Sequence, residues 1–126
     1  MKYLNFSKNH IVTDINGGWV IAENGEALSI PFEIFFKNIV LIDDRWGKSV
    51  KLLTSLMDVR EKVKALSFND NKDNKILELT DEEWQQCIEI IENPQVGYNV
   101  NYASALLNHV HDIKNASSIP LKVADI

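Results

Sequence analysis

The chain has 126 residues, of which 45% are hydrophobic and 25% are charged, and its formal net charge is −5 at pH 7. This length and composition are typical of one soluble globular domain. The acidic balance disfavours a nucleic-acid partner, because binding to phosphates requires a concentration of Lys and Arg. A single cysteine excludes an intramolecular disulfide and a cysteine-rich zinc cluster, which favours a reducing compartment.

The N-terminal residues lack the apolar segment of a signal peptide. The most apolar run, residues 30–42, is too short to span a bilayer and contains two charged residues. We therefore expect a cytoplasmic protein that does not contact membranes. We also expect a single domain over residues 1–115, followed by a C-terminal tail of residues 116–126 that either frays or docks in an extended form.

The first thirty residues have the pattern of short strands separated by turns. Asn16-Gly17-Gly18 and Asn24-Gly25 each follow an apolar run, and Asn-Gly is the strongest short-range signal for a hairpin. These turns predict a three-stranded antiparallel meander that must pack on helices, because so small a sheet is unstable alone. The expected strands are His10–Ile15, Trp19–Glu23 and Glu26–Ile30, with Tyr3–Phe6 as a further edge strand.

Helices are predicted from residue 31 onward. Pro31 suits the first turn of an apolar helix capped by Ser29, although the run Asn38–Ile42 could equally be a buried strand. Asp43-Asp44 then offers a cap for a long helix over Arg45–Leu66. Its apolar stripe fits either a bundle core or a partner-binding seam, and consists of Leu52, Leu56, Val59, Val63 and Leu66.

Two more helices follow a polar connector at Ser67–Lys75. The connector contains oxygen donors but fails the EF-hand pattern, which requires a glycine and a glutamate at fixed positions. Thr80 and Glu83 have the spacing of a capping box, and Asn93-Pro94 ends the helix that they begin. The last helix runs from a cap at Asn99 or Asn101 to about Asn115. The predicted fold is therefore α+β, with the meander packed on a bundle of about four helices.

One polar and aromatic cluster stands out at a junction between helices, formed by Asp43, Asp44, Arg45 and Trp46. It has two interpretations, a capped corner held by a packed tryptophan, or an exposed site for a protein partner. Trp and Arg dominate the binding energy of protein interfaces. Trp19, beside a hairpin turn, has the same two interpretations. The candidate partner-binding residues of the chain are Asp44, Arg45, Trp46 and Trp19.

No catalytic or metal-binding motif is found. His109 and His111 are two residues apart and lie about 200° around a helix, so they cannot bind one metal ion together. Asp112 is placed to form only a surface pair with His109. Cys87 lies on an apolar stripe and is expected to be a buried hydrophobic residue. We therefore expect no catalytic residues, no metal and no cofactor.

Four stretches of the chain resemble small uncharacterised proteins of tailed bacteriophages. These are ALSIPFEIFFKNIVL, KSVKLLTSLMDVREKVKAL, ILELTDEEW and NVNYASALLNHV, and the resemblance covers residues 15–115. It lies in the order of the elements and includes a capping box of the form EL(S/T)xEE. The resemblance implies a small accessory or assembly protein that is not an enzyme, and it transfers no catalytic residues.

The leading hypothesis is a non-catalytic protein-interaction or assembly factor, encoded by a phage or mobile element. It would bind a protein partner, or a second copy as a homodimer, through an apolar helical face. Two alternatives stay open. One is an acidic inhibitor or immunity-type protein that covers a basic site with Glu78, Asp81, Glu82 and Glu89. The other is a small hydrolase, which would require His10, His109 or His111 to meet a carboxylate in a pocket.

Overall fold

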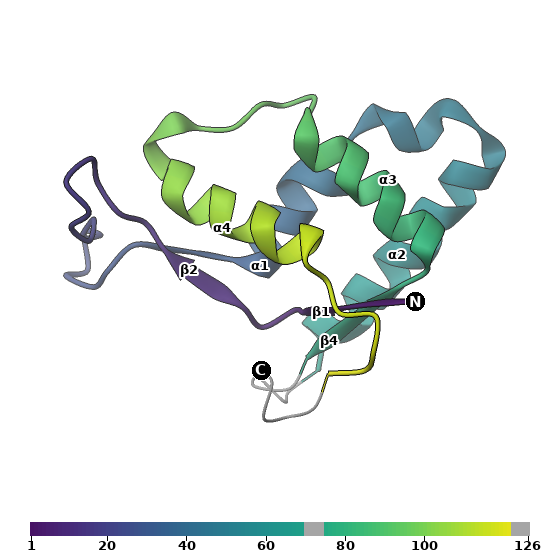
Figure 1. The fold of residues 1–126 in the computed structure, drawn as a ribbon, viewed down its shortest axis with the longest axis horizontal. Helices are drawn as coiled ribbons and strands as arrows, with labels where there is room; N and C mark the ends of the chain where they lie inside the picture. Colours follow the sequence, from purple (N-terminus) through teal and green to yellow (C-terminus); the bar gives the residue numbers. More distant parts are fainter. Residues whose placement is uncertain (70–74, 122–126) are drawn as a thin grey trace.

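The computed structural model describes residues 1–69 and 75–121 and shows an α+β fold (Figure 1). A helical body carries two small antiparallel sheets, and an arm of residues 12–28 extends away from that body. The strands are β1 (Lys2–Asn5), β2 (Asn9–Ile11), β3 (Ser29–Pro31) and β4 (Ile76–Leu79). The α-helices are α1 (Phe32–Phe35), α2 (Val50–Ser67), α3 (Asp81–Glu92) and α4 (Ala103–Lys114).

The predicted three-stranded meander is wrong, because the strands form two separate pairs, β1 with β4 and β2 with β3. In the arm, backbone hydrogen bonds join three residues in a closed ring. Val20 N–H donates to Val12 O at 3.1 Å, Leu28 N–H to Val20 O at 2.7 Å, and Val12 N–H to Leu28 O at 2.8 Å. The segments around Val12 and Leu28 therefore pair with each other as well as with the segment around Val20. In a flat meander the first and third strands do not pair.

The two turns of the arm were predicted correctly. Gly17 and Gly25 have φ angles of 81° and 83°, a left-handed conformation that glycine adopts without steric strain. Each turn closes only a single bridge, Thr13 with Trp19 and Ile21 with Ala27. The arm is thus two miniature hairpins. The expected strand Trp19–Glu23 does not form, whereas the expected strands His10–Ile15 and Glu26–Ile30 form only where they overlap β2 and β3.

Strand β4 was not predicted. It pairs with β1, so that Leu4 lies opposite Leu77 and Lys2 lies opposite Leu79. The expected edge strand at Tyr3–Phe6 does form, one residue earlier, but its partner lies more than seventy positions away along the chain. No local pattern indicates such a distant pairing, and β4 is only four residues long.

The apolar segment after β3 is helical, which decides between the two interpretations of residues 38–42. Helix α1 continues directly into a π-helical turn at Phe36–Val40.

The long helix expected over Arg45–Leu66 is divided. Asp44–Lys48 is a separate 3₁₀ helix, and Ser49 adopts an extended conformation and caps α2 by accepting a hydrogen bond from Leu52 N–H.

The caps of the later elements agree with the sequence. Thr80 accepts from Glu83 N–H, and the Glu83 carboxylate accepts from Thr80 N–H, which completes the capping box of α3. Asn99 caps a 3₁₀ turn at Val100–Tyr102 that leads into α4. The expected connector and tail lie partly outside the described residues, at 70–74 and 122–126. Ser117, in the described part of the tail, pairs with Tyr3.

One core joins all of these elements. The predicted stripe of α2 is buried through Leu56, Val59 and Val63, which belong to the same hydrophobic cluster as the phenylalanines of the α1 segment and apolar residues of α3 and α4. The Trp84 indole N–H donates to Ile113 O at 2.8 Å, which connects α3 to the end of α4. Within the described residues, none of the helices combines the length and apolar character needed to cross a bilayer.

Candidate functional site

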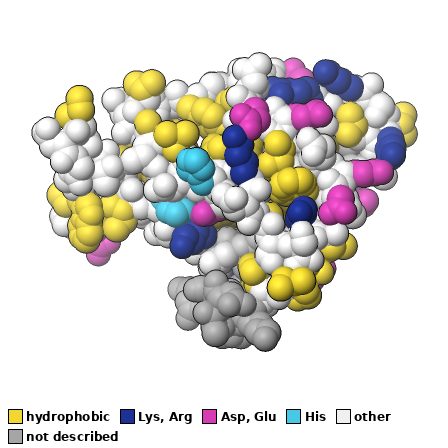
Figure 2. All heavy atoms as spheres, in the orientation of Figure 1, with side chains coloured by type: hydrophobic (Ala, Val, Ile, Leu, Met, Phe, Trp, Pro, Cys, Tyr) yellow, Lys and Arg dark blue, Asp and Glu magenta, His cyan; other side chains and the backbone are white. Residues whose placement is uncertain are grey.

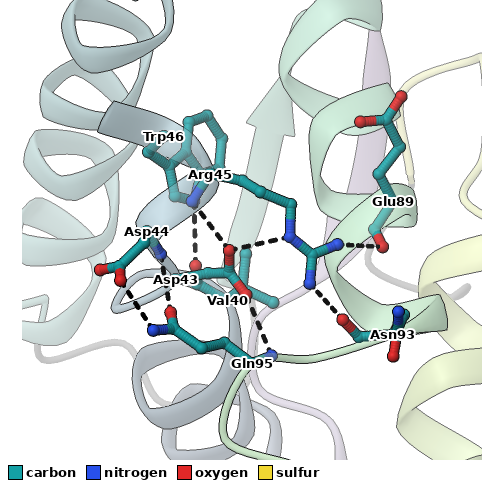
Figure 3. Close-up of polar contacts among 8 residues, drawn as sticks. All are labelled: Val40, Asp43, Asp44, Arg45, Trp46, Glu89, Asn93 and Gln95. Carbon is teal, nitrogen blue, oxygen red and sulfur yellow. Dashed lines mark hydrogen bonds and ion pairs between the residues drawn. The ribbon is translucent and has the colours of Figure 1, made fainter. Parts of the chain in front are cut away.

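The corner at residues 43–46 is a packed structural joint (Figure 3). Trp46 is fully buried, and its indole N–H donates to Val40 O at 2.9 Å. Trp46 is therefore not the exposed residue that the partner-binding interpretation requires, and its burial agrees with the corner-packing alternative.

Asp44 and Arg45 are also engaged within the chain (Figure 3). The Arg45 guanidinium donates to Glu89 O at 2.8 Å and to Asn93 O, two carbonyls at the C-terminal end of α3. Its Nε–H donates to the buried carboxylate of Asp43 at 3.1 Å. Asp44 exchanges two hydrogen bonds with the side chain of Gln95. These polar groups join the 3₁₀ helix to the C-terminal end of α3 and to the residues that follow it.

Trp19, the fourth candidate residue, is 64% exposed. It lies on the arm, where Ile15 and Ile21 are 99% and 59% exposed. Figure 2 shows apolar side chains gathered on this part of the molecule. The structure therefore separates the candidates: three of them form the joint, and Trp19 belongs to an exposed apolar group on the arm.

A second cluster contains two of the histidines that the small-hydrolase alternative requires, but the carboxylate that it brings to them was not predicted. His10 from β2 and Asp112 from α4 form a pair with 2.6 Å between Nε2 and Oδ2, and the His109 ring lies 4.5 Å from the His10 ring. The expectation that Asp112 forms a surface pair with His109 is wrong, because Asp112 contacts His10 and His109 is fully buried. Residues 10 and 112 are far apart in sequence, so only the packing of β2 on α4 brings them together.

The surroundings of His109 keep its ring neutral. The ring stacks on Phe35 with 5.2 Å between centroids and meets the edge of Phe32 at 5.9 Å. Burial lowers the pKa of His109, His10 and Lys8 lower it further, and the Ile30 carbonyl and Asp112 oppose this shift. Burial dominates, so His109 carries one ring proton rather than two.

Asp112 also faces a cavity of about 250 Å³ between β1 and the end of α4. Its lining includes Lys8, Asn5 and Asn115 as polar residues. Histidine side chains reach the surface on the face shown in Figure 2, close to acidic and basic side chains. The site is therefore a partly exposed cluster of one carboxylate and two imidazoles, at the base of the arm.

The cysteine is not part of either site. Cys87 is fully buried in α3, and burial raises the pKa of its thiol far above the ordinary value, with a further contribution from Glu83. A thiol in this environment stays protonated and is not a nucleophile. This agrees with the expectation that Cys87 serves as a small hydrophobic residue.

Comparisons with known proteins add no assignment: no protein-family model, no curated protein and no solved structure matches the chain. The functional argument therefore depends on the residues of this chain alone.

Proposed function

We propose that this protein is a non-catalytic protein-interaction or assembly factor, encoded by a phage or mobile element, whose arm binds a protein partner. The observation that supports this is the exposure of Ile15, Trp19 and Ile21 on one projecting element. Large apolar side chains that gather on a projecting surface are typical of interaction sites. Tryptophan in particular contributes strongly to binding energy when a partner covers it.

The shape of the arm supports the same proposal. A cavity lies between the arm and the segment that enters α4, and its apolar lining includes Ile15, Val20, Val100 and Tyr102. A cavity beside an exposed tryptophan can receive a side chain of the partner, which is how central interface residues are desolvated. The ring of hydrogen bonds at the base of the arm holds its two hairpins in place before binding, which reduces the entropy lost on association.

A helical face remains the alternative surface for the same function. Besides its buried stripe, α2 exposes Val50, Leu53 and Met57, which are spaced by three and four residues and so share one face. This face lacks an aromatic residue, whereas the arm provides Trp19. We therefore favour the arm, and the α2 face provides a matched comparison.

The experiment captures partners from a lysate of the native host and identifies a stoichiometric one by mass spectrometry. Binding of that purified partner is then measured by calorimetry for the wild type, for Trp19→Ala/Ile21→Ser and for Leu53→Ser/Met57→Ser. We expect the arm variant to bind roughly thirtyfold more weakly, as for loss of about 2 kcal/mol at a hot spot. The α2 variant should bind like the wild type.

Equal affinity of the arm variant and the wild type would contradict the proposal, provided that both have the same melting temperature. Selective loss in the α2 variant would instead assign the function to the helical face. Light scattering after size exclusion shows whether the partner is a second copy, since the arm variant would then shift from dimer to monomer.

The acidic-inhibitor alternative has less support. Several acidic residues of α3 are paired with cations of the same chain: Asp81 with the N-terminal amine, Glu82 with Lys51, and Glu83 with Lys62. Lys114 similarly pairs with Glu92. These pairs reduce the negative potential that this face could present to a basic partner.

One specific observation supports the small-hydrolase alternative: His10 contacts Asp112 beside a cavity. A carboxylate that orients a histidine is one part of a general-base site. Hydrolysis of ester and phosphoester test substrates by the wild type, lost in His10→Gln, would establish this alternative and displace the non-catalytic proposal.

A further inference from the structure

Three side chains that can ligate a metal converge where β2 packs on α4. One ligand atom from each of His10, His109 and Asp112 lies within 4.8 Å of the other two. The side chain of His10 is 16% exposed and that of Asp112 is 40% exposed, whereas His109 is fully buried. A metal ion could thus reach the cluster from solvent, with one ligand fixed in the core and two nearer the surface.

The hydrogen bonding of His109 leaves one of its ring nitrogens available to a metal ion. Its Nε2 lies 2.6 Å from the backbone oxygen of Ile30, and a carbonyl oxygen can only accept, so the ring proton is on Nε2. Nδ1 therefore carries a lone pair. It is buried and has no hydrogen-bond partner among the described residues. Metal-ligating histidines commonly donate their other ring N–H to a backbone carbonyl in this way.

A buried polar atom without a partner costs free energy, so the unpaired Nδ1 requires an explanation. A bound water can satisfy such an atom when other polar groups hold the water in place. The neighbours of the His109 ring, however, are the rings of Phe32, Phe35 and His10. A cation beside the cluster would satisfy the lone pair and would also be attracted by the Asp112 carboxylate.

We propose that His10, His109 and Asp112 form a binding site for a zinc-class divalent transition metal. Two imidazoles and one carboxylate are ligands that Zn²⁺ and Co²⁺ accept readily, whereas Ca²⁺ and Mg²⁺ prefer sites built from oxygen alone. Three protein ligands leave one position of a tetrahedral ion open to water or to an external ligand. The site would clamp β2, at the base of the arm, to α4.

The adjustment that binding requires is small. Two ligands at about 2.1 Å from a tetrahedral ion lie about 3.4 Å apart, and His10 Nε2 now lies 2.6 Å from Asp112 Oδ2. The metal would replace the proton that this pair shares, and the partly exposed Asp112 side chain can rotate to make room. Lys8 lies near the cluster and opposes a cation, so metal binding must outweigh that repulsion.

The experiment uses tag-free protein that has been stripped with a chelator, because a polyhistidine tag would itself bind the probe. Calorimetry with ZnCl₂ at neutral pH should give one site per chain, and Co²⁺ should give the visible absorption of a four-coordinate ion. His10→Gln and Asp112→Asn should each weaken binding by at least roughly tenfold. CaCl₂ and MgCl₂ should give no comparable heat.

His111→Gln is the matched control, because His111 lies on the same helix but is exposed and outside the cluster. This variant should bind zinc like the wild type. An equal loss in His111→Gln and His10→Gln, or the same weak binding in every variant, would show adventitious surface binding and overturn the proposal.

A measurement on the unmodified chain covers the case in which a variant fails to fold. Nitrogen-15 spectra of the imidazole rings should show zinc-dependent changes at His10 and at Nδ1 of His109, with His111 unchanged. Changes confined to His111, or the absence of saturable changes at all three rings, would overturn the site. Because the arm surface is not involved, this result is independent of partner binding.

Discussion

The indole of Trp46 donates its hydrogen bond to the carbonyl of Val40, six residues earlier, across the end of the π-helical turn. That carbonyl also accepts from Asp43 N–H at 3.3 Å, so the indole adds a second, shorter hydrogen bond to the same acceptor. The tryptophan therefore serves two purposes at once, because it fills the corner and satisfies its own buried N–H.

Trp46→Ala is accordingly expected to destabilise the domain by about 3–5 kcal/mol, the range for a large buried aromatic replaced by alanine. Trp46→Phe should be milder, since it leaves a smaller cavity but still loses the bond to Val40. Urea unfolding followed by circular dichroism measures both. A variant Trp46→Ala with wild-type stability would disprove the structural role assigned here.

The joint between the 3₁₀ helix and α3 depends on Arg45. In Arg45→Met the buried carboxylate of Asp43 loses its cation, and two carbonyls of α3 lose a donor. We expect a loss of about 2–4 kcal/mol, because an uncompensated buried charge is costly. Lys51→Met is the control: its pair with Glu82 is fully at the surface, so the change should be below about 1 kcal/mol.

Thr80 tests the capping box. Thr80→Ala removes the hydroxyl that accepts from Glu83 N–H and should lower the free energy of unfolding by about 1 kcal/mol. Thr80→Ser retains the hydroxyl and should stay close to the wild type. If chemical denaturation ranks the two variants equally, then the hydroxyl contributes nothing to the stability of α3.

Tyr98 provides a pH-dependent prediction. Its hydroxyl donates to Ile91 O at 2.8 Å, and burial, with a smaller contribution from Glu92, raises its pKa to about 12. The unfolded chain releases this proton near pH 10, so the folded state binds more protons between these pH values. The contribution of Tyr98 to stability is therefore complete below pH 10 and falls as pH rises toward 12.

Ultraviolet absorbance of phenolate measures this titration directly. The wild type should show an ionisation step near pH 12, and Tyr98→Phe should remove that step. Persistence of the step in this variant would show that Tyr98 is not the protected group.

Features that depend on neighbours along the chain could be predicted from the amino-acid sequence. The capping box at Thr80, the turns at Gly17 and Gly25, the apolar stripe of α2 and the burial of Cys87 follow from residues within one or two turns of each other. Such features need only local backbone geometry and side-chain spacing. They were enough to predict an α+β fold with about four helices.

The remaining features depend on packing between segments that are distant in the sequence. The pairing of β1 with β4, the closed ring of the arm, the burial of Trp46 and the meeting of His10 with Asp112 all join residues that no local period connects. A capping residue contacts its own helix, but a histidine on a strand obtains its partner from whichever helix packs there. The exposure of Trp19 likewise depends on packing, because the arm that carries it extends away from the helical body (Figure 1).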